Sequence, residues 1–337
     1  MIQKYANIND ILDSFNNLRI FTKQNINLEK NLLQKNLHEE ITSVWKTDEI
    51  KRSRPTPVEE AKWGLAVIED SLWNAIPKIC SRFNNSVKYY TNKDLPINFS
   101  PIVFGSWMGG DRDGNPNVTA KTTKEVILLS RWEAASLYEK EFTKLIQSLS
   151  LHDCSKKIKK VVGKTWEPYR VFLRPIRNKL KQTQKEIESC LKENRMPKQT
   201  LLVQSINEII EPLNDVYNSL SLVKCQIIAD GIVLDLIRRA HTFGLNLTKL
   251  DIRQEAARHY KLITSVCKKL GIADYSKLSE EAKIQFLSKE YKSRRPLIPQ
   301  NIKLDADDRE TWTTFKMISA SLSILEGSGK ISAPTSL

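Results

Sequence analysis

Glycine is scarce in this chain and concentrated in one place. The 337 residues contain 11 glycines, and four of them fall within ten residues: Gly105, Gly109, Gly110 and Gly114. Glycine is required where the backbone adopts positive φ or closely approaches another segment, and it weakens a helix elsewhere. We therefore expect a mainly helical chain that is interrupted by one special loop.

The spacing of capping and apolar residues supports a mainly α fold. Thr56 and Glu59 have the spacing of a capping box, and Pro57 stands at the first helical position. Thr122 and Glu125 predict a second capping box and therefore a second helix start. After the first box, apolar residues recur at helical spacing: Ala61, Leu65, Ile68, Leu72 and Ile76.

Two segments are predicted as strands, residues 102–104 before the glycine-rich loop and residues 245–253. Side chains alternate faces along an extended chain, so Asp251 and Arg253 share one face of the second strand. An acid and a base on one face are unusual for a core strand. They predict a polar pocket at its C-terminal end.

The formal net charge of +14 is compatible with nucleic acid, an acidic membrane or a phosphorylated metabolite as partner. A solvated basic surface also explains this charge, and we favour it. The most basic stretch, residues 155–164, combines lysines with Ile158, Val161 and Val162, as an amphipathic helix does. It lacks the interleaved aromatic residues of single-strand binders, so we expect no nucleic-acid partner.

The five cysteines are scattered and form no C-x-x-C pair, which favours reduced thiols in a cytoplasmic compartment over disulfides or a zinc site. No apolar run approaches the roughly 18 residues of a membrane span. The first thirty residues lack the apolar core of a signal peptide. We expect a cytoplasmic protein with no membrane partner.

The sequence of the glycine-rich loop does not match two familiar binding motifs. Gly105 and Gly110 have Walker spacing, but Asp111 stands where a lysine is required. An EF-hand is also excluded, because Pro116 and Thr122 occupy its glycine and glutamate positions. Two interpretations remain. The charged residues 111–113 pair with one another in a tight connection, or the loop belongs to a binding site.

Two long strings resemble the phosphoenolpyruvate carboxylase family. Residues 104–119 are similar to the signature F-x-S-W-M-G-G-D-R-D-G-N-P-N-V-T. Residues 243–259 are similar to F-G-x-x-L-x-x-L-D-I-R-Q-E-S-x-R-H, with Ala256 in place of the usual serine. Shorter matching pieces extend the resemblance from about residue 40 to residue 317, in the right order. The chain therefore resembles an internal segment of this family.

The resemblance implies a fold and a reaction. The implied fold is mainly α, a partial (β/α)8 barrel with many added helices over residues 1–318, followed by an off-pattern tail, residues 319–337. The family carboxylates phosphoenolpyruvate with bicarbonate, giving oxaloacetate for the tricarboxylic acid cycle and phosphate, with Mg²⁺ or Mn²⁺. The intact family enzyme commonly forms a tetramer.

Site residues are also carried over from the resemblance. It implies that Arg253 binds the substrate phosphate and that Trp107 lines the bicarbonate and carbon dioxide pocket. The simpler alternatives are that Arg253 only pairs with Asp251 and that Trp107 is a buried core residue. The implied active-site loop contains Gly109, Gly110, Asp111, Arg112, Asp113 and Asn115.

The remaining aromatic and histidine residues are given structural interpretations. Arg258 and His259 lie in the second motif, where we expect a structural role. The tryptophans expected in the core are Trp63, Trp73 and Trp132. His38, His152 and His241 are not spaced with other residues as in a catalytic or metal site, and we expect no functional role for them.

The family's catalytic histidine segment, T-A-H-P-T, and its F-H-G-R-G-G loop do not occur in these 337 residues. Its metal-binding carboxylates are expected beyond the matching region. We therefore expect no catalytic residue and no metal ligand in this chain, and no activity from the chain alone. Two explanations stay open, one part of a split enzyme or a decayed, non-catalytic remnant. A basic nucleic-acid-binding protein is disfavoured because the basic residues are scattered.

Overall fold

The computed structural model describes residues 26–47 and 54–325. The chain divides into two compact units, residues 1–55 and residues 56–337, and each is considered by itself. In the first unit the structure describes helix α2 (Ile26–Trp45). His38 lies on this helix.

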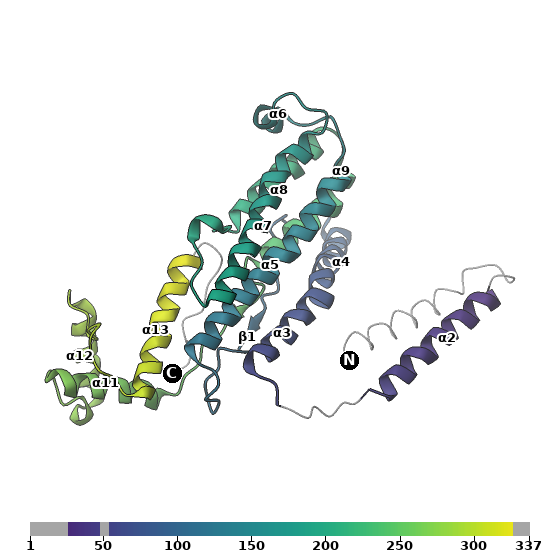
Figure 1. The fold of residues 1–337 in the computed structure, drawn as a ribbon. Coiled ribbons are helices and arrows are strands. Elements are labelled where there is room, and N and C mark those ends of the chain that lie inside the picture. Colours follow the sequence, from purple (N-terminus) through teal and green to yellow (C-terminus); the bar gives the residue numbers. More distant parts are fainter. Residues whose placement is uncertain (1–25, 48–53, 326–337) are drawn as a thin grey trace. The chain divides into compact units, whose positions relative to one another are not determined.

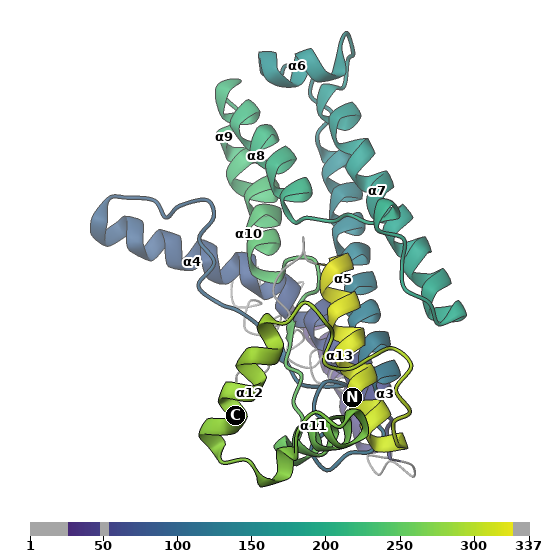
Figure 2. The ribbon, with the colours of Figure 1, turned by 90° about the vertical axis from the view of Figure 1, so that its left-hand side faces the viewer.

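The described part of the second unit is predominantly helical, which confirms the predicted mainly α class (Figures 1 and 2). Its elements, in chain order, are α3 (Pro57–Val67), the π-helical turn η2 (Ile68–Leu72), α4 (Trp73–Thr91), β1 (Gly105–Ser106), α5 (Ala120–Ser148), α6 (Lys156–Val162), α7 (Pro168–Glu193), the 3₁₀ turn η3 (Gln199–Leu201), α8 (Asn207–Leu222), α9 (Gln226–Ile228), the π-helical turn η4 (Ala229–Val233), α10 (Leu234–Phe243), β2 (Lys249–Leu250), α11 (Ala256–Leu270), the 3₁₀ turn η5 (Tyr275–Lys277), α12 (Glu280–Lys292) and α13 (Ala306–Leu325).

The two helix starts predicted from capping boxes have different outcomes. The first is confirmed, because Thr56 Oγ1 accepts from Glu59 N at 3.3 Å and Glu59 Oε2 accepts from Thr56 N at 2.8 Å. The second is wrong by one turn. Thr119 caps α5 by accepting from Thr122 N at 3.3 Å, which places Thr122 inside the helix. A carboxylate distant in sequence adds to this cap, since Glu310 Oε1 accepts from Ala120 N at 2.5 Å.

Helix α5 is the central element of the second unit and packs against α3, α7 and α13. It buries apolar side chains along most of its length, among them Leu128, Phe142 and Leu145. It also holds the segment that leads into β2. Tyr138 Oη donates to Gly244 O at 2.8 Å, and Ser130 Oγ donates to Asn246 O. Complete burial raises the pKa of Tyr138 far above its ordinary value, so the phenol keeps the proton that it donates.

Strands β1 and β2 form a parallel pair with Gly105 opposite Lys249 and Ser106 opposite Leu250. The first strand was predicted at residues 102–104, which is too early in the chain. The carbonyl of Phe104 is where the pairing begins, because it accepts from Lys249 N at 3.0 Å. The second strand is shorter than the predicted 245–253, since residues 244–246 bond to α5 instead. The partial barrel stays a prediction.

The C-terminal boundary predicted at residue 318 also stays a prediction. Helix α13 continues through Leu325, so the first seven residues of the predicted tail, 319–325, are helical. The rest of that tail, residues 326–337, lies outside the described residues.

No helix in the described ranges is both long enough and apolar enough to cross a membrane.

A buried carboxylate closes the turn after α7. Glu186 Oε1 accepts from Arg195 Nη1 at 2.6 Å and from the backbone N of Lys198 at 2.8 Å. Cys190 Sγ lies 3.5 Å from the same oxygen. The Arg195 guanidinium is the main cause of a lowered Glu186 pKa, about 2 instead of 4.5. Glu186 therefore stabilises the folded state only while it is ionised.

This depressed pKa predicts a pH-dependent loss of stability. A carboxyl whose folded pKa is lowered contributes fully above its ordinary pKa, and the contribution is lost as the pH falls from about 4.5 to about 2. Glu186→Gln should lower the free energy of unfolding at pH 7 by roughly 2 kcal/mol. Urea unfolding measured between pH 7 and pH 3 should show this difference shrinking. The exposed Glu211→Gln is the control and should change little; an equal deficit of Glu186→Gln at every pH would contradict the assignment.

Candidate functional site

The candidate site is built on a short parallel ladder between residues 104–112 and residues 249–253. Beyond the Phe104 pairing, Asp251 N donates to Ser106 O at 2.8 Å and Arg253 N donates to Gly110 O at 3.0 Å. Arg112 N then donates back to Arg253 O at 3.1 Å. The two motifs, about 140 residues apart in sequence, therefore lie side by side.

The first segment of the ladder, residues 104–112, makes a turn within it. Gly110 N and Asp111 N both donate to Trp107 O, at 2.9 and 3.0 Å. Met108 and Gly109, which lie between Trp107 and Gly110, therefore loop out of the ladder. Gly109 in this turn has a φ of 76°, in the left-handed region that favours glycine. Because of this turn, the first segment pairs again at Asp111, directly opposite Arg253.

Gly110 is required for close approach of the two backbones. A Cβ atom at this position would lie 2.2 Å from the carbonyl oxygen of Asp251, well inside any tolerable contact. That oxygen belongs to backbone, which cannot move aside as the end of a flexible side chain can. At Gly105, by comparison, a Cβ would meet Lys249 O at an ordinary 3.8 Å.

Arg253 is surrounded by three groups on one face of the ladder. Its Nη1 lies 3.8 Å from Asp111 Oδ2, its Nη2 lies 3.4 Å from Asp251 Oδ2, and its Cζ lies 5.7 Å from the centre of the Trp107 ring. The Arg253 side chain is 47% exposed. Long ion pairs at an exposed position contribute little to stability. The guanidinium is therefore held in place by weak contacts and remains accessible to an anion.

Trp107 is 60% exposed, so it is not the buried core residue of the simpler interpretation. Trp73 is 2% exposed and confirms its predicted core position. The same prediction is wrong for Trp63, which is 45% exposed on α3. Trp132 is partly buried, and its Nε1 donates to Glu188 Oε1 at 3.0 Å. An exposed indole beside a guanidinium distinguishes Trp107 from these three.

Arg112 points away from Arg253 and into the protein. Its guanidinium donates to Gly110 O at 3.1 Å and to Thr123 Oγ1 on α5 at 2.6 Å, while Thr123 Oγ1 donates to Gly109 O at 2.7 Å. Burial lowers the Arg112 pKa, and the nearby Glu310 carboxylate opposes this effect. Arg112 and Thr123 thus fix the two adjacent glycines to α5. In this structure Arg112 positions the loop and does not face the Arg253 cluster.

Asp113 and Asn115 shape the outer end of the loop. Asp113 N donates to Asp111 Oδ1 at 3.1 Å, and Asn117 N donates to Asn115 Oδ1 at 3.0 Å. Such side-chain to backbone bonds stabilise tight turns. Of the charged residues predicted at the loop, the structure brings Asp111 next to Arg253 and leaves Asp113 exposed to solvent.

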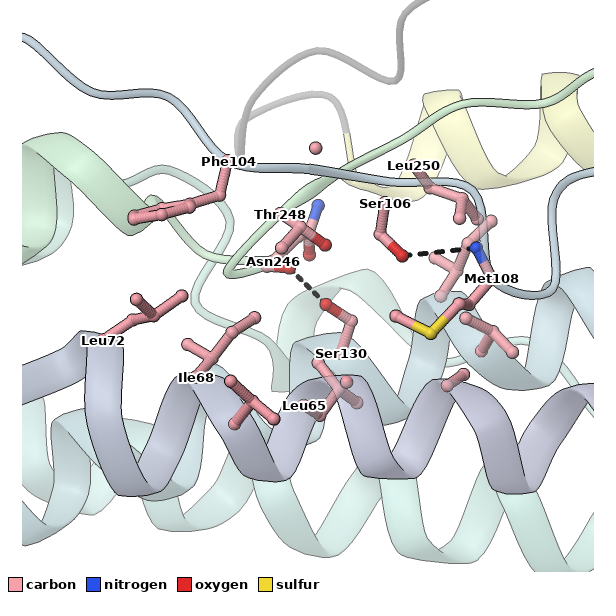
Figure 3. Close-up of a pocket in the computed structure, with 16 residues that line it drawn as sticks. Leu65, Ile68, Leu72, Phe104, Ser106, Met108, Ser130, Asn246, Thr248 and Leu250 are labelled. Atoms are coloured by element: carbon pink, nitrogen blue, oxygen red, sulfur yellow. Dashed lines mark hydrogen bonds between the residues drawn. The ribbon is translucent and has the colours of Figure 1, made fainter. Parts of the chain in front are cut away.

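The opposite face of the ladder covers a cavity of about 300 Å³ (Figure 3). Leu65, Ile68 and Leu72 close one side of it, while Phe104 and Met108 lie on the ladder side. No ionisable side chain lines it; the polar groups are hydroxyls and an amide, from Ser106, Ser130, Asn246 and Thr248. An anionic substrate is therefore better matched to the Arg253 face than to this cavity.

The Mg²⁺ or Mn²⁺ implied by the resemblance is assigned no ligands. In the described ranges no three His, Cys, Asp or Glu side chains are grouped as metal ligands. Asp111 and Asp251 are two carboxylates near each other, but Arg253 lies against both. His259 packs against Phe315, with 5.4 Å between ring centres, and burial lowers its pKa. That contact is in keeping with the structural role expected for His259.

Asp251 was placed on the same strand face as Arg253 by the alternation of side chains, and the structure brings the two together. Two other residues of the site were not singled out from the sequence. Thr123 and Glu310 gave no local signal, because their partners lie on other segments. Only the folded chain brings these groups to the loop.

The close approach at Gly110 predicts an unequal effect of two identical substitutions. Gly110→Ala should lower the free energy of unfolding by about 2–3 kcal/mol, because the new methyl group collides with the Asp251 carbonyl. Gly105→Ala, in the same ladder, is the control and should cost less than about 1 kcal/mol. Urea denaturation at pH 7 measures both. Equal losses for the two variants would show that the backbones do not approach as described.

The phosphoenolpyruvate carboxylase family model matches residues 1–327. The chain is 41% identical over 318 residues to the phosphoenolpyruvate carboxylase of Hahella chejuensis, covering 94% of this chain and 35% of the relative. It is 43% identical over 304 residues to that of Pseudomonas putida, covering 90% and 35%. It is 40% identical over 320 residues to that of Salmonella typhi, covering 94% and 36%. The chain thus spans about a third of the length of these curated relatives.

Proposed function

Because the chain belongs to the phosphoenolpyruvate carboxylase family, we propose that it supplies part of the substrate site of an enzyme that converts phosphoenolpyruvate and bicarbonate into oxaloacetate and phosphate. The proposal includes a cytoplasmic location, supply of oxaloacetate to the tricarboxylic acid cycle, and a tetrameric intact enzyme. Each of these features is taken from the family.

The observation that carries this proposal is the setting of Arg253. Its guanidinium is about half exposed, lies over the Trp107 ring and has only long contacts to Asp111 and Asp251. A guanidinium binds a phosphate through two parallel charge-assisted hydrogen bonds, which are stronger than its present ion pairs. A phosphate arriving at this face would compete with the two carboxylates for the same donors. Arg253 is accordingly assigned to the substrate phosphate.

Trp107 is assigned to the bicarbonate and carbon dioxide side of the same site. In the family reaction, a bicarbonate oxygen bonds to phosphorus and the bond from phosphorus to the enol oxygen breaks. The products are carboxyphosphate and an enolate. Carboxyphosphate then releases carbon dioxide, and the enolate carbon bonds to it. The enolate must be kept from water, which would protonate it. The Trp107 indole lies against Arg253 and offers an apolar surface beside the phosphate position.

The loop residues position these two groups. Arg112 and Thr123 hold the adjacent glycines against α5, and Gly110 allows the ladder that sets Arg253 opposite Asp111. When bound, a divalent Mg²⁺ or Mn²⁺ ion would offset phosphate charge and stabilise the enolate oxygen. No ligand for that ion is assigned among the described residues. Phosphate binding and exclusion of water are the roles that remain for this chain.

The simplest account of catalysis is that this chain alone does not turn over substrate. Residues that act as a unit lose orders of magnitude in rate when one of them is missing. A phosphate-binding arginine and one wall of the pocket supply only part of that unit. Two alternatives remain within the proposal, one part of a split enzyme and a decayed, non-catalytic remnant.

A chimera tests the role of Arg253. The matching third of the Pseudomonas putida relative would be replaced by this chain, and Arg253→Ala introduced into the product. Loss of one charge-assisted contact, about 1.5–3 kcal/mol, predicts a kcat/KM for phosphoenolpyruvate that is roughly 10-fold to 100-fold lower. Arg82→Ala, an exposed arginine on α4, is the control and should leave kcat/KM unchanged. Equal kinetics for the Arg253 variant and the parent chimera would remove the phosphate assignment.

The isolated chain gives a second test. Incubated with phosphoenolpyruvate, bicarbonate and Mg²⁺, it should form no oxaloacetate above a heat-treated control in an assay coupled to malate dehydrogenase. Bicarbonate-dependent turnover by the chain alone would contradict this prediction, because the chain would then contain the catalytic residues that we place elsewhere. Adding the separately expressed flanking parts of a relative separates the two alternatives, since restored activity favours a split enzyme and continued inactivity favours decay.

A further inference from the structure

One end of the helical unit carries an unusual surface that the proposed function does not use. It is formed by α6, the segment that follows it, the last residue of α8, the link from α8 to α9, and α9. These elements lie at the same end of the unit in both views (Figures 1 and 2). We call this surface the lysine cap. Its members are Lys156, Lys157, Lys159, Lys160, Val161, Lys164, Trp166, Leu222, Lys224 and Ile227.

The lysine cap is fixed to the helices beneath it. Ser219 Oγ on α8 accepts from Ser155 N, just before α6, at 2.8 Å, and Tyr169 Oη on α7 lies 2.8 Å from the same oxygen. Lys157 Nζ lies 2.5 Å from Asp215 Oδ1 on α8. Ile158 is fully buried and attaches α6 to the core. The cap is therefore a formed surface with a defined set of outward side chains.

Large apolar side chains on the cap are exposed to solvent. Trp166 and Ile227 are each 87% exposed, Leu222 is 75% exposed and Val161 is 68% exposed. Single exposed apolar residues are common on proteins and need no explanation. Four such residues at one end of a unit, one of them a tryptophan, indicate a surface that contacts something apolar.

The same end is strongly basic. Within the described ranges, Lys157 is the one lysine of the cap in an ion pair, and the other five are exposed. Of the nearest carboxylates, Asp215 pairs with Lys157, Glu167 pairs with Arg170 at 2.6 Å, and Asp153 lies 3.4 Å from His152 Nε2. Lys159 and Lys164 also line a hollow of about 450 Å³ together with Trp166 and Asp153. Positive charge and an apolar side chain therefore meet in one hollow.

We propose that the lysine cap binds the surface of an anionic phospholipid bilayer. Lysines beside an anionic membrane gain electrostatic attraction, and tryptophan favours the boundary between headgroups and acyl chains. The hollow is lined by Trp166, by Lys159 and Lys164, and by one carboxylate, Asp153, so its two lysines leave it net positive for a phosphodiester headgroup next to an acyl chain. This contact at a membrane surface replaces the expectation from sequence that no membrane takes part; it requires no spanning helix.

Two other partners fit the lysine cap less well. Single-stranded nucleic acid is bound by several aromatic side chains along a basic groove, whereas the cap has one aromatic residue, Trp166. A second copy of the chain would bring the five unpaired lysines of one cap against those of another, and like charges in contact are repulsive. A bilayer of negative charge satisfies both the lysines and the apolar residues.

Vesicle co-sedimentation of the full chain tests this proposal. The chain should bind vesicles that contain 30% phosphatidylglycerol and not vesicles of phosphatidylcholine alone, and binding should weaken between 0.05 and 0.5 M NaCl. The double variant Lys159→Glu/Lys160→Glu should lower the partition coefficient at least about tenfold. Trp166→Ser should lower it several-fold without changing the dependence on salt. Circular dichroism would verify that each variant retains the helical content of the parent.

A charge-matched control lies on α12, at the other end of the unit in Figure 2. Lys289→Glu/Lys292→Glu makes the same change in net charge at two exposed positions and should leave vesicle binding unchanged. Equal loss for both double variants would overturn the proposal, because net charge alone would then explain binding. Binding to neutral vesicles, or binding of single-stranded DNA but not vesicles through the same lysines, would overturn it as well.

Discussion

Four backbone hydrogen bonds hold residues 104–112 against residues 249–253, and the position of each group at the candidate site depends on them. A two-stranded parallel pair is marginal by itself in water. Here α5 supports both segments of the ladder. Tyr138 and Ser130 donate hydrogen bonds to residues that lead into β2, while Thr123 donates one to the carbonyl of Gly109 in the other segment. One helix therefore fixes the register of two segments that are far apart in sequence.

The ladder separates two environments because side chains alternate across it. One face carries Arg253, Asp111, Asp251 and Trp107, and the other covers an apolar cavity against α3 and α5. The reaction that we propose combines a highly charged phosphate ester with apolar carbon dioxide, so it needs both kinds of surface close together. On the Arg253 face, the exposed Trp107 ring already places an apolar surface against a cation. The cavity on the opposite face is lined mainly by apolar side chains of α3, α5 and the ladder.

Part of this arrangement was predictable from sequence and part was not. The mainly helical class followed from apolar spacing and from the clustering of glycine, and the capping box at Thr56 followed from local chemistry. The pairing of Asp251 with Arg253 followed from alternation in an extended chain. These features depend on residues close together in sequence, where a pattern carries enough information.

Features that depend on distant contacts were missed or misplaced. Helix α5 begins at Ala120 with Thr119 and not Thr122 as its N-cap, and Glu310, 190 residues from Ala120, completes the cap. Trp63 was expected in the core, but on α3 it is 45% exposed. Arg112 was placed in the active-site loop, but the sequence did not indicate that its guanidinium is buried against Thr123. A sequence pattern does not say which side of a loop faces the core.

In the function that we propose, Arg253 is the group that binds the substrate phosphate. The most direct measurement is a crystal structure of the chimera described above, with phosphoenolpyruvate bound. We predict phosphate oxygens within about 2.7–3.2 Å of the Arg253 guanidinium nitrogens, with the guanidinium released from Asp111 or Asp251 and still beside the Trp107 ring. A phosphate bound elsewhere, with Arg253 unchanged between its two carboxylates, would contradict the account.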